Sequence, residues 1–174
     1  MQRSTSLRIG IESDATCLAA LSIQVWLDTY AVDGIRPSIA QYVFAEFTPA
    51  AFRQRLADPN VEVAIAEMNG HLVGFAVIRH GQVCPCDSDA GSEIQTLYVQ
   101  PRFARGGVGS MLLDRCRHLV RQRTADAGVW LSVNARNGPA LAFYRKQGWQ
   151  HVGSIDFEFS GEKHENHVLV AAQP

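Results

Sequence analysis

A glycine-rich turn between an alternating segment and an amphipathic segment is the part of this sequence best suited to bind a ligand. The turn consists of Arg105, Gly106, Gly107, Val108, Gly109 and Ser110. Glycines let a backbone turn tightly and approach a ligand, and the first N–H groups of the helix that follows lie at its positive end. Such turns hold phosphate oxygens. A plain helix start that uses glycines for packing is the alternative, and three glycines so close together favour the anion site.

The residues around the glycines distinguish between kinds of phosphate site. A nucleoside triphosphate loop needs Lys and then Ser or Thr after its last glycine, whereas Ser110 and Met111 follow Gly109 here. A dinucleotide-binding turn needs a third glycine near Leu112 and an acidic residue after the next strand, and neither is present. The turn therefore predicts a different phosphate-bearing ligand.

A pair of polar residues, the second candidate feature of the sequence, lies at a short predicted helix that covers residues 139–147. Asn137 and Tyr144, with the small Ala140 between them, are spaced to share one helix face, along which a ligand can lie. A helix cap is the alternative for Asn137, and a half-buried aromatic ring is the alternative for Tyr144. Taken one at a time, both residues fit these alternatives better.

Taken together, the two segments resemble the GNAT superfamily of acetyl-CoA-dependent N-acetyltransferases. LYVQPRFARGGVGSMLL, which starts at Leu97, is similar to the family's pyrophosphate-binding loop and helix. NARNGPALAFYRKQGW, which ends at Trp149, is similar to its second cofactor-binding motif. One departure is Ala104, which stands where the family usually has Gln or Arg. The neighbouring Arg105 could supply that charge, and the backbone cradle needs N–H groups rather than this side chain.

The resemblance implies how the cofactor is held. Strand residues Leu97, Tyr98 and Val99 would line the pantetheine arm of acetyl-CoA in a splay between the fourth and fifth strands, with backbone groups of Leu97 and Val99 pairing with its amides. The N–H groups of residues 105–110 would hold the pyrophosphate. Asn137 would contact the cofactor from the other side.

The resemblance also implies a direct transfer of the acetyl group to an amine. Tyr144 would protonate the departing thiolate as the general acid. Glu93 is the candidate general base, because strand alternation places it on the face that Gln95 shares. The proton would pass to it through water, unless the substrate enters as the free amine. A solvated carboxylate at the strand end is the alternative for Glu93.

The acceptor is expected to be the primary amine of a small molecule, and a polyamine is one candidate. The N-terminal segment is similar to the branch of the family that acetylates spermidine and spermine. Asp87, Asp89 and Glu93 could attract a polycation, although a solvated acidic loop is the alternative. Acetylation of a peptide or protein, and a regulatory module that binds acyl-CoA without turnover, also stay open. Metal is not expected, because the close pair Cys84 and Cys86 lacks a second pair.

Bulk composition is that of one soluble globular domain over residues 1–174. The net charge of −1 gives no field that would recruit nucleic acid or an anionic membrane. No secretory leader is recognisable, which predicts a cytoplasmic protein, and the family resemblance is compatible with a homodimer. Cys17 and Cys116 fall on apolar helix positions and are expected to be buried.

Hydrophobic periodicity predicts a mixed α/β fold with a central sheet of six to seven strands and helices on both faces. The expected strands cover residues 7–12, two strands joined at Asn69-Gly70 within 61–81, 93–99, 129–133, 150–159 and 165–171, with Gly161 in the last turn. The expected helices run from Ser13 or Asp14 to Tyr30, over 37–47, from Pro49, from the glycine turn to Val120, and over 139–147.

Overall fold

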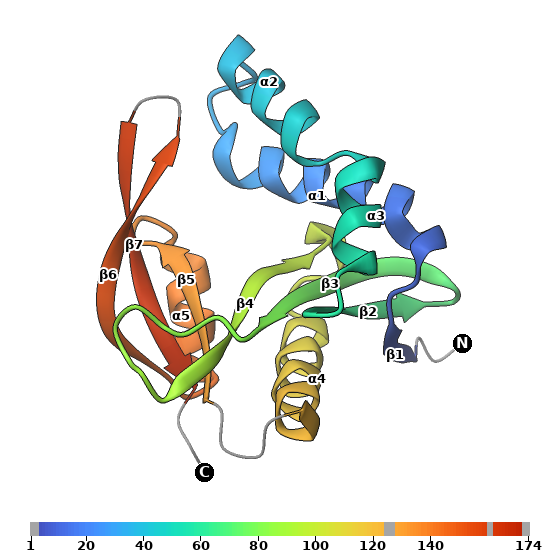
Figure 1. Cartoon of the computed structure of the whole chain (residues 1–174). Coiled ribbons are helices and arrows are strands. Elements are labelled where there is room, and N and C mark those ends of the chain that lie inside the picture. The colour runs from blue at the N-terminus through green and yellow to red at the C-terminus, as the bar shows by residue number, and fades with distance from the viewer. Residues whose placement is uncertain (1–3, 124–127, 160–161, 172–174) are drawn as a thin grey trace. The chain divides into compact units, whose positions relative to one another are not determined.

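The computed structural model describes residues 4–123, 128–159 and 162–171 of the chain, coloured by residue number in Figure 1. The strands are β1 (Thr5–Ile9), β2 (Val61–Met68), β3 (His71–His80), β4 (Ala90–Val99), β5 (Gly128–Asn134), β6 (Trp149–Phe159) and β7 (Glu162–Ala171). The α-helices are α1 (Ala15–Tyr30), α2 (Pro37–Glu46), α3 (Pro49–Ala57), α4 (Val108–Arg123) and α5 (Gly138–Lys146). Two short 3-10 helices are η1 (Glu12–Asp14) and η2 (Pro101–Phe103).

The strands form one seven-stranded sheet in the order β1-β2-β3-β4-β5-β7-β6. β1 pairs with β2 in antiparallel register, whereas β4 and β5 run parallel. The predicted mixed α/β architecture is therefore confirmed. The recorded β4–β5 ladder ends at the pair Glu93 and Trp130, while β5 continues to Asn134 beside β7, as expected for two strands that splay.

The chain divides into two compact units, and β3, β4 and α4 each contribute to both. The first unit comprises Met1–Val77 and Thr96–Cys116, and the second comprises Ile78–Gln95 and Arg117–Pro174.

The first unit packs α1 and α3 around an aromatic and aliphatic core. The ring of Phe52 on α3 meets that of Phe75 on β3 edge to face, with ring centroids 5.8 Å apart, and both side chains are buried. Thr48 begins α3 as predicted, because its hydroxyl oxygen accepts a hydrogen bond of 3.0 Å from the N–H of Ala51. These contacts hold α3 over the apolar side chains of β2 and β3.

The first strand is displaced from its predicted position. It covers Thr5–Ile9 instead of residues 7–12, and Glu12–Asp14 form η1. Arg8 explains the difference, because its guanidinium donates hydrogen bonds of 2.7 Å to both Asp14 and Glu67. This ion network ties η1 to the end of β1 and to β2, and apolar alternation alone does not reveal it.

The turn between β2 and β3 has the predicted hairpin geometry. Asn69 and Gly70 have φ angles of 53° and 76°, as a two-residue turn with both residues left-handed requires. The Asn-Gly hairpin is therefore confirmed.

The second unit is built on the β6–β7 hairpin, which pairs with β5 through β7 (Figure 1). α5 lies against β6, where the ring of Tyr144 meets that of Trp149 with centroids 5.9 Å apart. Arg117 joins the two elements, because it donates a hydrogen bond of 3.0 Å to the carbonyl oxygen of Gln147 while its guanidinium lies over the Trp149 ring. The C-terminal end of α5 is therefore firmly attached to the sheet.

Two further expectations about single residues have different outcomes. Cys116 is fully buried as predicted, but Cys17 is exposed, so the prediction for Cys17 is wrong. Cys17 lies between the buried residues Ala15 and Leu18 on α1, just outside the stripe that faces the core. Gly161, expected in the β6–β7 turn, falls outside the described residues. Of the helices that the structure describes, none combines the length and the apolarity needed to cross a bilayer.

Candidate active site

The glycine-rich turn has the geometry of an anion cradle at the start of α4. Ala104 is extended, Arg105 and Gly107 are left-handed with φ angles of 63° and 85°, and the helix begins at Val108. The N–H of Met111 donates a bond of 3.0 Å to the carbonyl oxygen of Gly107, so the N–H groups before it belong to the unpaired first turn. Residues 104–107 are exposed. These features make the loop available to a ligand.

Burial of α4 holds this loop in place. Val108, Leu112, Leu113 and Cys116 are all buried side chains of this helix. A side chain at position 107 would meet no steric obstacle, since nothing lies within 4 Å of a Cβ built on Gly107. The positive φ is therefore the reason for a glycine here.

β3 and β4 approach each other closely where Leu97, Tyr98 and Val99 lie. A Cβ added to Gly74 would be 2.9 Å from the carbonyl oxygen of Tyr98. The Tyr98 ring packs edge to face against Phe75 and Phe47, with centroids 5.8 and 6.4 Å away. The half-buried side chain of Tyr98 is thus held by the aromatic rings of the first unit.

Glu93 lies in the second unit, beside Trp130 at the last recorded pair of the β4–β5 ladder. Its neighbours Ser92 and Ile94 are buried on one face of β4, and the Ser92 hydroxyl lies 3.3 Å from Nδ1 of His80. Glu93 and Gln95 are on the opposite face, where the Gln95 side-chain amide donates a bond of 3.2 Å to the Glu93 carboxylate. The alternation predicted for these two residues is therefore observed.

Burial raises the pKa of the Glu93 carboxyl above its usual value of 4.5, and the Gln95 hydrogen bond and the Arg79 charge oppose that shift. A carboxylate that is partly removed from water holds a proton more strongly than one on a solvated strand end. Glu93 is accordingly better suited to accept a proton than an ordinary surface glutamate.

Asn137 and Tyr144 lie at the two ends of α5. The Asn137 side-chain oxygen accepts a bond of 3.1 Å from the N–H of Ala140, so Asn137 caps the helix. Tyr144 is buried, and its ring packs against Phe143 and Trp149. Both alternatives weighed from the sequence are thus realised, and neither excludes contact with a ligand.

The predicted site residues fall into two groups. Residues 97–99 and 105–110 belong to the first unit, whereas Glu93, Asn137 and Tyr144 belong to the second. Within the second unit, Glu93 is on the sheet and the other two are on α5.

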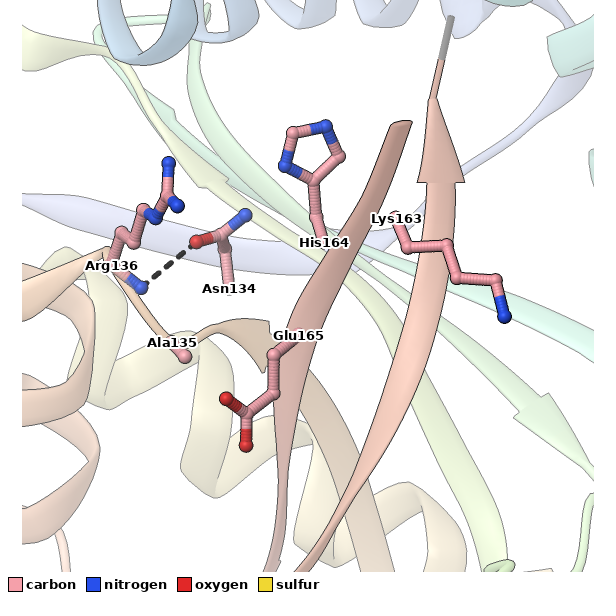
Figure 2. A pocket seen from close by; sticks show the side chains of 6 residues that line it. All are labelled: Asn134, Ala135, Arg136, Lys163, His164 and Glu165. Atoms are coloured by element: carbon pink, nitrogen blue, oxygen red, sulfur yellow. Dashed lines mark hydrogen bonds between the residues drawn. The ribbon is translucent and has the colours of Figure 1, made fainter. Parts of the chain in front are cut away.

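A cavity of about 270 Å³, which the sequence motifs do not predict, opens in the second unit at the end of β5. It is lined by Asn134, Ala135, Arg136, Lys163, His164 and Glu165, which Figure 2 shows as sticks. The two lining segments are adjacent because the N–H of Ala135 donates a bond of 2.9 Å to the carbonyl oxygen of Glu165. Only the β5–β7 register brings them together, so no local sequence pattern could have revealed the cavity.

The acidic segment before β4 is a folded turn. The Asp87 carboxylate accepts a bond of 3.0 Å from the N–H of Asp89, and the N–H of Cys84 donates to the carbonyl oxygen of Ala90. The buried Cys84 packs with Trp130 in an apolar cluster of this unit. Residues 4–123, 128–159 and 162–171 contain no cluster of three His, Cys, Asp or Glu side chains that could hold a metal ion.

Comparison with known sequences places these features in context. The profile described as the Acetyltransferase (GNAT) family matches residues 25–149. An uncharacterized N-acetyltransferase of Mycobacterium tuberculosis is 31% identical over 135 residues, which are 76% of this chain and 80% of that protein. The profile match over residues 25–149 includes the glycine-rich turn, β4 and α5.

Two relatives with more specific names differ in their acceptors. The N-alpha-acetyltransferase RimI of Mycobacterium tuberculosis is 37% identical over 106 residues, 60% of this chain and 62% of the relative. The aminoalkylphosphonate N-acetyltransferase of Salmonella typhimurium is 31% identical over 122 residues, 68% of this chain and 78% of the relative. The relatives thus do not point to one acceptor.

Among solved structures, the PaiA N-acetyltransferase of Thermoplasma acidophilum in complex with coenzyme A has the same fold. It superposes with a TM-score of 0.77 over 98% of this chain and 99% of that one, at 17% identity.

Proposed function

Because this chain belongs to the acetyltransferase (GNAT) family, we propose that it moves the acetyl group of acetyl-CoA to a primary amine of a small molecule by direct attack. The family and the acetyltransferase activity predicted from the sequence are confirmed, as is acetyl-CoA as the co-substrate of that activity. The residue roles and the acceptor below are proposals.

The observation that carries the proposed mechanism is the placement of Glu93. Its carboxylate lies where the recorded β4–β5 ladder ends, and burial raises its pKa. An alkylammonium with a pKa near 10.4 has to lose a proton before its nitrogen can attack. Glu93 accepts that proton through a water molecule. Its raised pKa reduces the difference between the pKa of the ammonium and that of the carboxyl group.

The transfer then proceeds by attack of the neutral nitrogen on the thioester carbonyl carbon. A carbon–nitrogen bond forms, the carbon–sulfur bond breaks, and the thiolate leaves. Tyr144 supplies the proton that converts this thiolate into the thiol of CoA. Support for this role is its buried position on α5, which fixes the phenol ring against Trp149.

Acetyl-CoA is held by groups from both sequence motifs. The N–H groups of residues 105–110 bind its pyrophosphate, which the left-handed Arg105 and Gly107 and the exposure of residues 104–107 support. Leu97, Tyr98 and Val99 offer backbone groups to the pantetheine arm. Asn137 contacts the cofactor from the start of α5.

A peptide or protein amine is the second candidate acceptor, and the relative named N-alpha-acetyltransferase favours it. The relative named aminoalkylphosphonate N-acetyltransferase, whose match spans more of this chain, favours a small amine. A single domain over residues 1–174, a cytoplasmic location, a homodimer and a polyamine acceptor stay predictions from the sequence.

The direct test measures acetyl-CoA-dependent release of thiol with a panel of amines: spermidine, free amino acids, aminoalkylphosphonates, aminoglycosides and peptides. Calorimetry measures CoA binding in parallel. Turnover on a small amine supports the proposal. Turnover confined to peptides replaces it with the second candidate. Tight CoA binding without turnover on any amine would identify a regulatory acyl-CoA-binding module instead.

A further inference from the structure

We propose that the cavity at the end of β5 binds an acidic group of the acceptor, so that the substrate is an amine that also carries a carboxylate, phosphate or phosphonate. This inference rests on the proposed function, because it assigns the acceptor of the same reaction. The expected acceptor is then not a polyamine but a molecule that carries both an amine and an acidic group.

Arg136 is the cation that such a group would meet. Its side chain is exposed at the cavity, and no described residue forms an ion pair or hydrogen bond with its guanidinium. The planar guanidinium can offer paired N–H donors to a carboxylate or a phosphonate. A guanidinium at a cavity, without an anionic partner in the described part of the chain, is a site for an anion from outside.

Asn134 supplies a second, oriented donor. Its side-chain oxygen accepts a bond of 2.9 Å from the N–H of Arg136, which fixes the amide and turns its nitrogen away from that bond. In Figure 2 this nitrogen lies on the side of His164, and the side chains of Arg136 and His164 extend in the same direction on either side of Asn134. Donor groups of three residues therefore line one side of the cavity.

The acidic residue of the lining does not neutralise this side. A carboxylate oxygen of Glu165 lies 3.9 Å from Nε2 of His167, and in Figure 2 it points away from Arg136 and His164. The Lys163 ammonium is 3.6 Å from Asp156, at the outer strand of the hairpin. Among the charged residues of the lining, Arg136 is thus the one without an ion-pair partner in the described part of the chain, and it leaves the cavity with a positive charge.

The position of the cavity relative to Glu93 sets the size of the acceptor. Trp130 pairs with Glu93, and Asn134 lies four residues later on β5, so both β5 residues face the same side of the sheet. Four residues of strand span about 13 Å, so the two β5 positions are separated by the length of a small extended molecule. An amine at Glu93 and an acidic group at Arg136 therefore fit a short chain that joins the two.

The test compares acceptors that differ only in the acidic group. We expect γ-aminobutyrate and an aminoalkylphosphonate to be better acceptors than n-butylamine or putrescine. Arg136→Gln should raise the KM for the acidic amines about tenfold or more and leave n-butylamine unchanged, because one charge-assisted contact is lost. Arg121→Gln is the matched control, since Arg121 is exposed at the end of α4 and does not line the cavity.

A binding measurement separates this inference from the proposed function. Titration of the protein with methylphosphonate, followed by NMR of the Asn134 side-chain amide, should give a saturable shift that Arg136→Gln removes and Arg121→Gln retains. Turnover without acid preference, together with no such shift, would overturn the inference and leave acetyl transfer intact. A shift that depends on Arg136, in a protein that acetylates no amine, would support the anion site and overturn the proposed function.

Discussion

The side-chain amide of Gln95 donates a hydrogen bond of 3.2 Å to the carboxylate of Glu93, two residues earlier on the same face of β4. This bond stabilises the ionised form of Glu93, whereas burial destabilises it and is the larger effect, so the pKa of Glu93 lies above 4.5. Because the two effects oppose each other, a substitution that removes the Gln95 hydrogen bond should change the pKa of Glu93.

Glu93→Gln removes the proposed base while it keeps the shape of the side chain. We expect kcat/KM at neutral pH to fall about a hundredfold or more, as for loss of a general base. Steady-state kinetics with the best amine of the panel measures this. If the variant keeps full activity when the amine is largely protonated, Glu93 is not the base.

The same substitution should affect stability in the opposite direction. Because the folded-state pKa of Glu93 is raised, its contribution to the free energy of unfolding is complete below the unfolded value of 4.5 and is lost as the pH rises through the folded value. Glu93→Gln should therefore melt at the same temperature as the wild type or a higher one at neutral pH. A lower melting temperature would mean that ionised Glu93 stabilises the fold.

Gln95→Ala removes the bond that lowers the pKa of Glu93. We expect the acid limb of the kcat/KM profile to move to higher pH, because ionised Glu93 loses a donor. Gln82→Ala serves as the control, since Gln82 is exposed and contacts Trp130 through its backbone oxygen alone. An unchanged profile would mean that the acid limb does not report the ionisation of Glu93.

Tyr144→Phe keeps the aromatic ring against Trp149 and removes the proposed acid. Turnover should fall about tenfold to a hundredfold, and the dissociation constant of acetyl-CoA should stay nearly unchanged, because the hydroxyl acts in the transition state. Rapid-mixing kinetics and calorimetry separate the two quantities. Equal loss of turnover and of acetyl-CoA binding would make Tyr144 a cofactor-binding residue instead.

Gly107→Asp places a negative charge and a strained backbone in the proposed phosphate cradle. Acetyl-CoA binding should be abolished, because the carboxylate repels the pyrophosphate and φ is 85° at this position. Gly70→Asp is the matched control, with a φ of 76° and open space around it in the β2–β3 turn. If both variants bind acetyl-CoA equally well, its phosphates lie elsewhere.

Local patterns predicted most elements of this fold because their signals lie within a few residues. Thr48 and Pro49 begin α3, and Asn69-Gly70 forms the β2–β3 turn, since each acts through the conformation of its own segment. The start of β4 is the contrast. It lies at Ala90 instead of Glu93, because Ala90 is paired with Gly128, far away in the sequence.

The candidate site was predictable only where its residues form a motif. The glycine-rich turn and Asn137 belong to continuous segments, so their local geometry follows from spacing. Arg136 and His164 line one cavity only because β5 and β7 are paired in a particular register, which composition and periodicity do not encode. Asp14 likewise binds Arg8 across the end of β1, which periodicity does not reveal.

Transfer of carbon-13-labelled acetyl from acetyl-CoA to the nitrogen of an acceptor amine tests the central claim most directly. The account predicts that mass spectrometry finds one labelled acetyl group on the amine for each CoA released, and that Glu93→Gln slows both equally. Release of CoA without labelled amine, or labelled amine at the wild-type rate in Glu93→Gln, would contradict it.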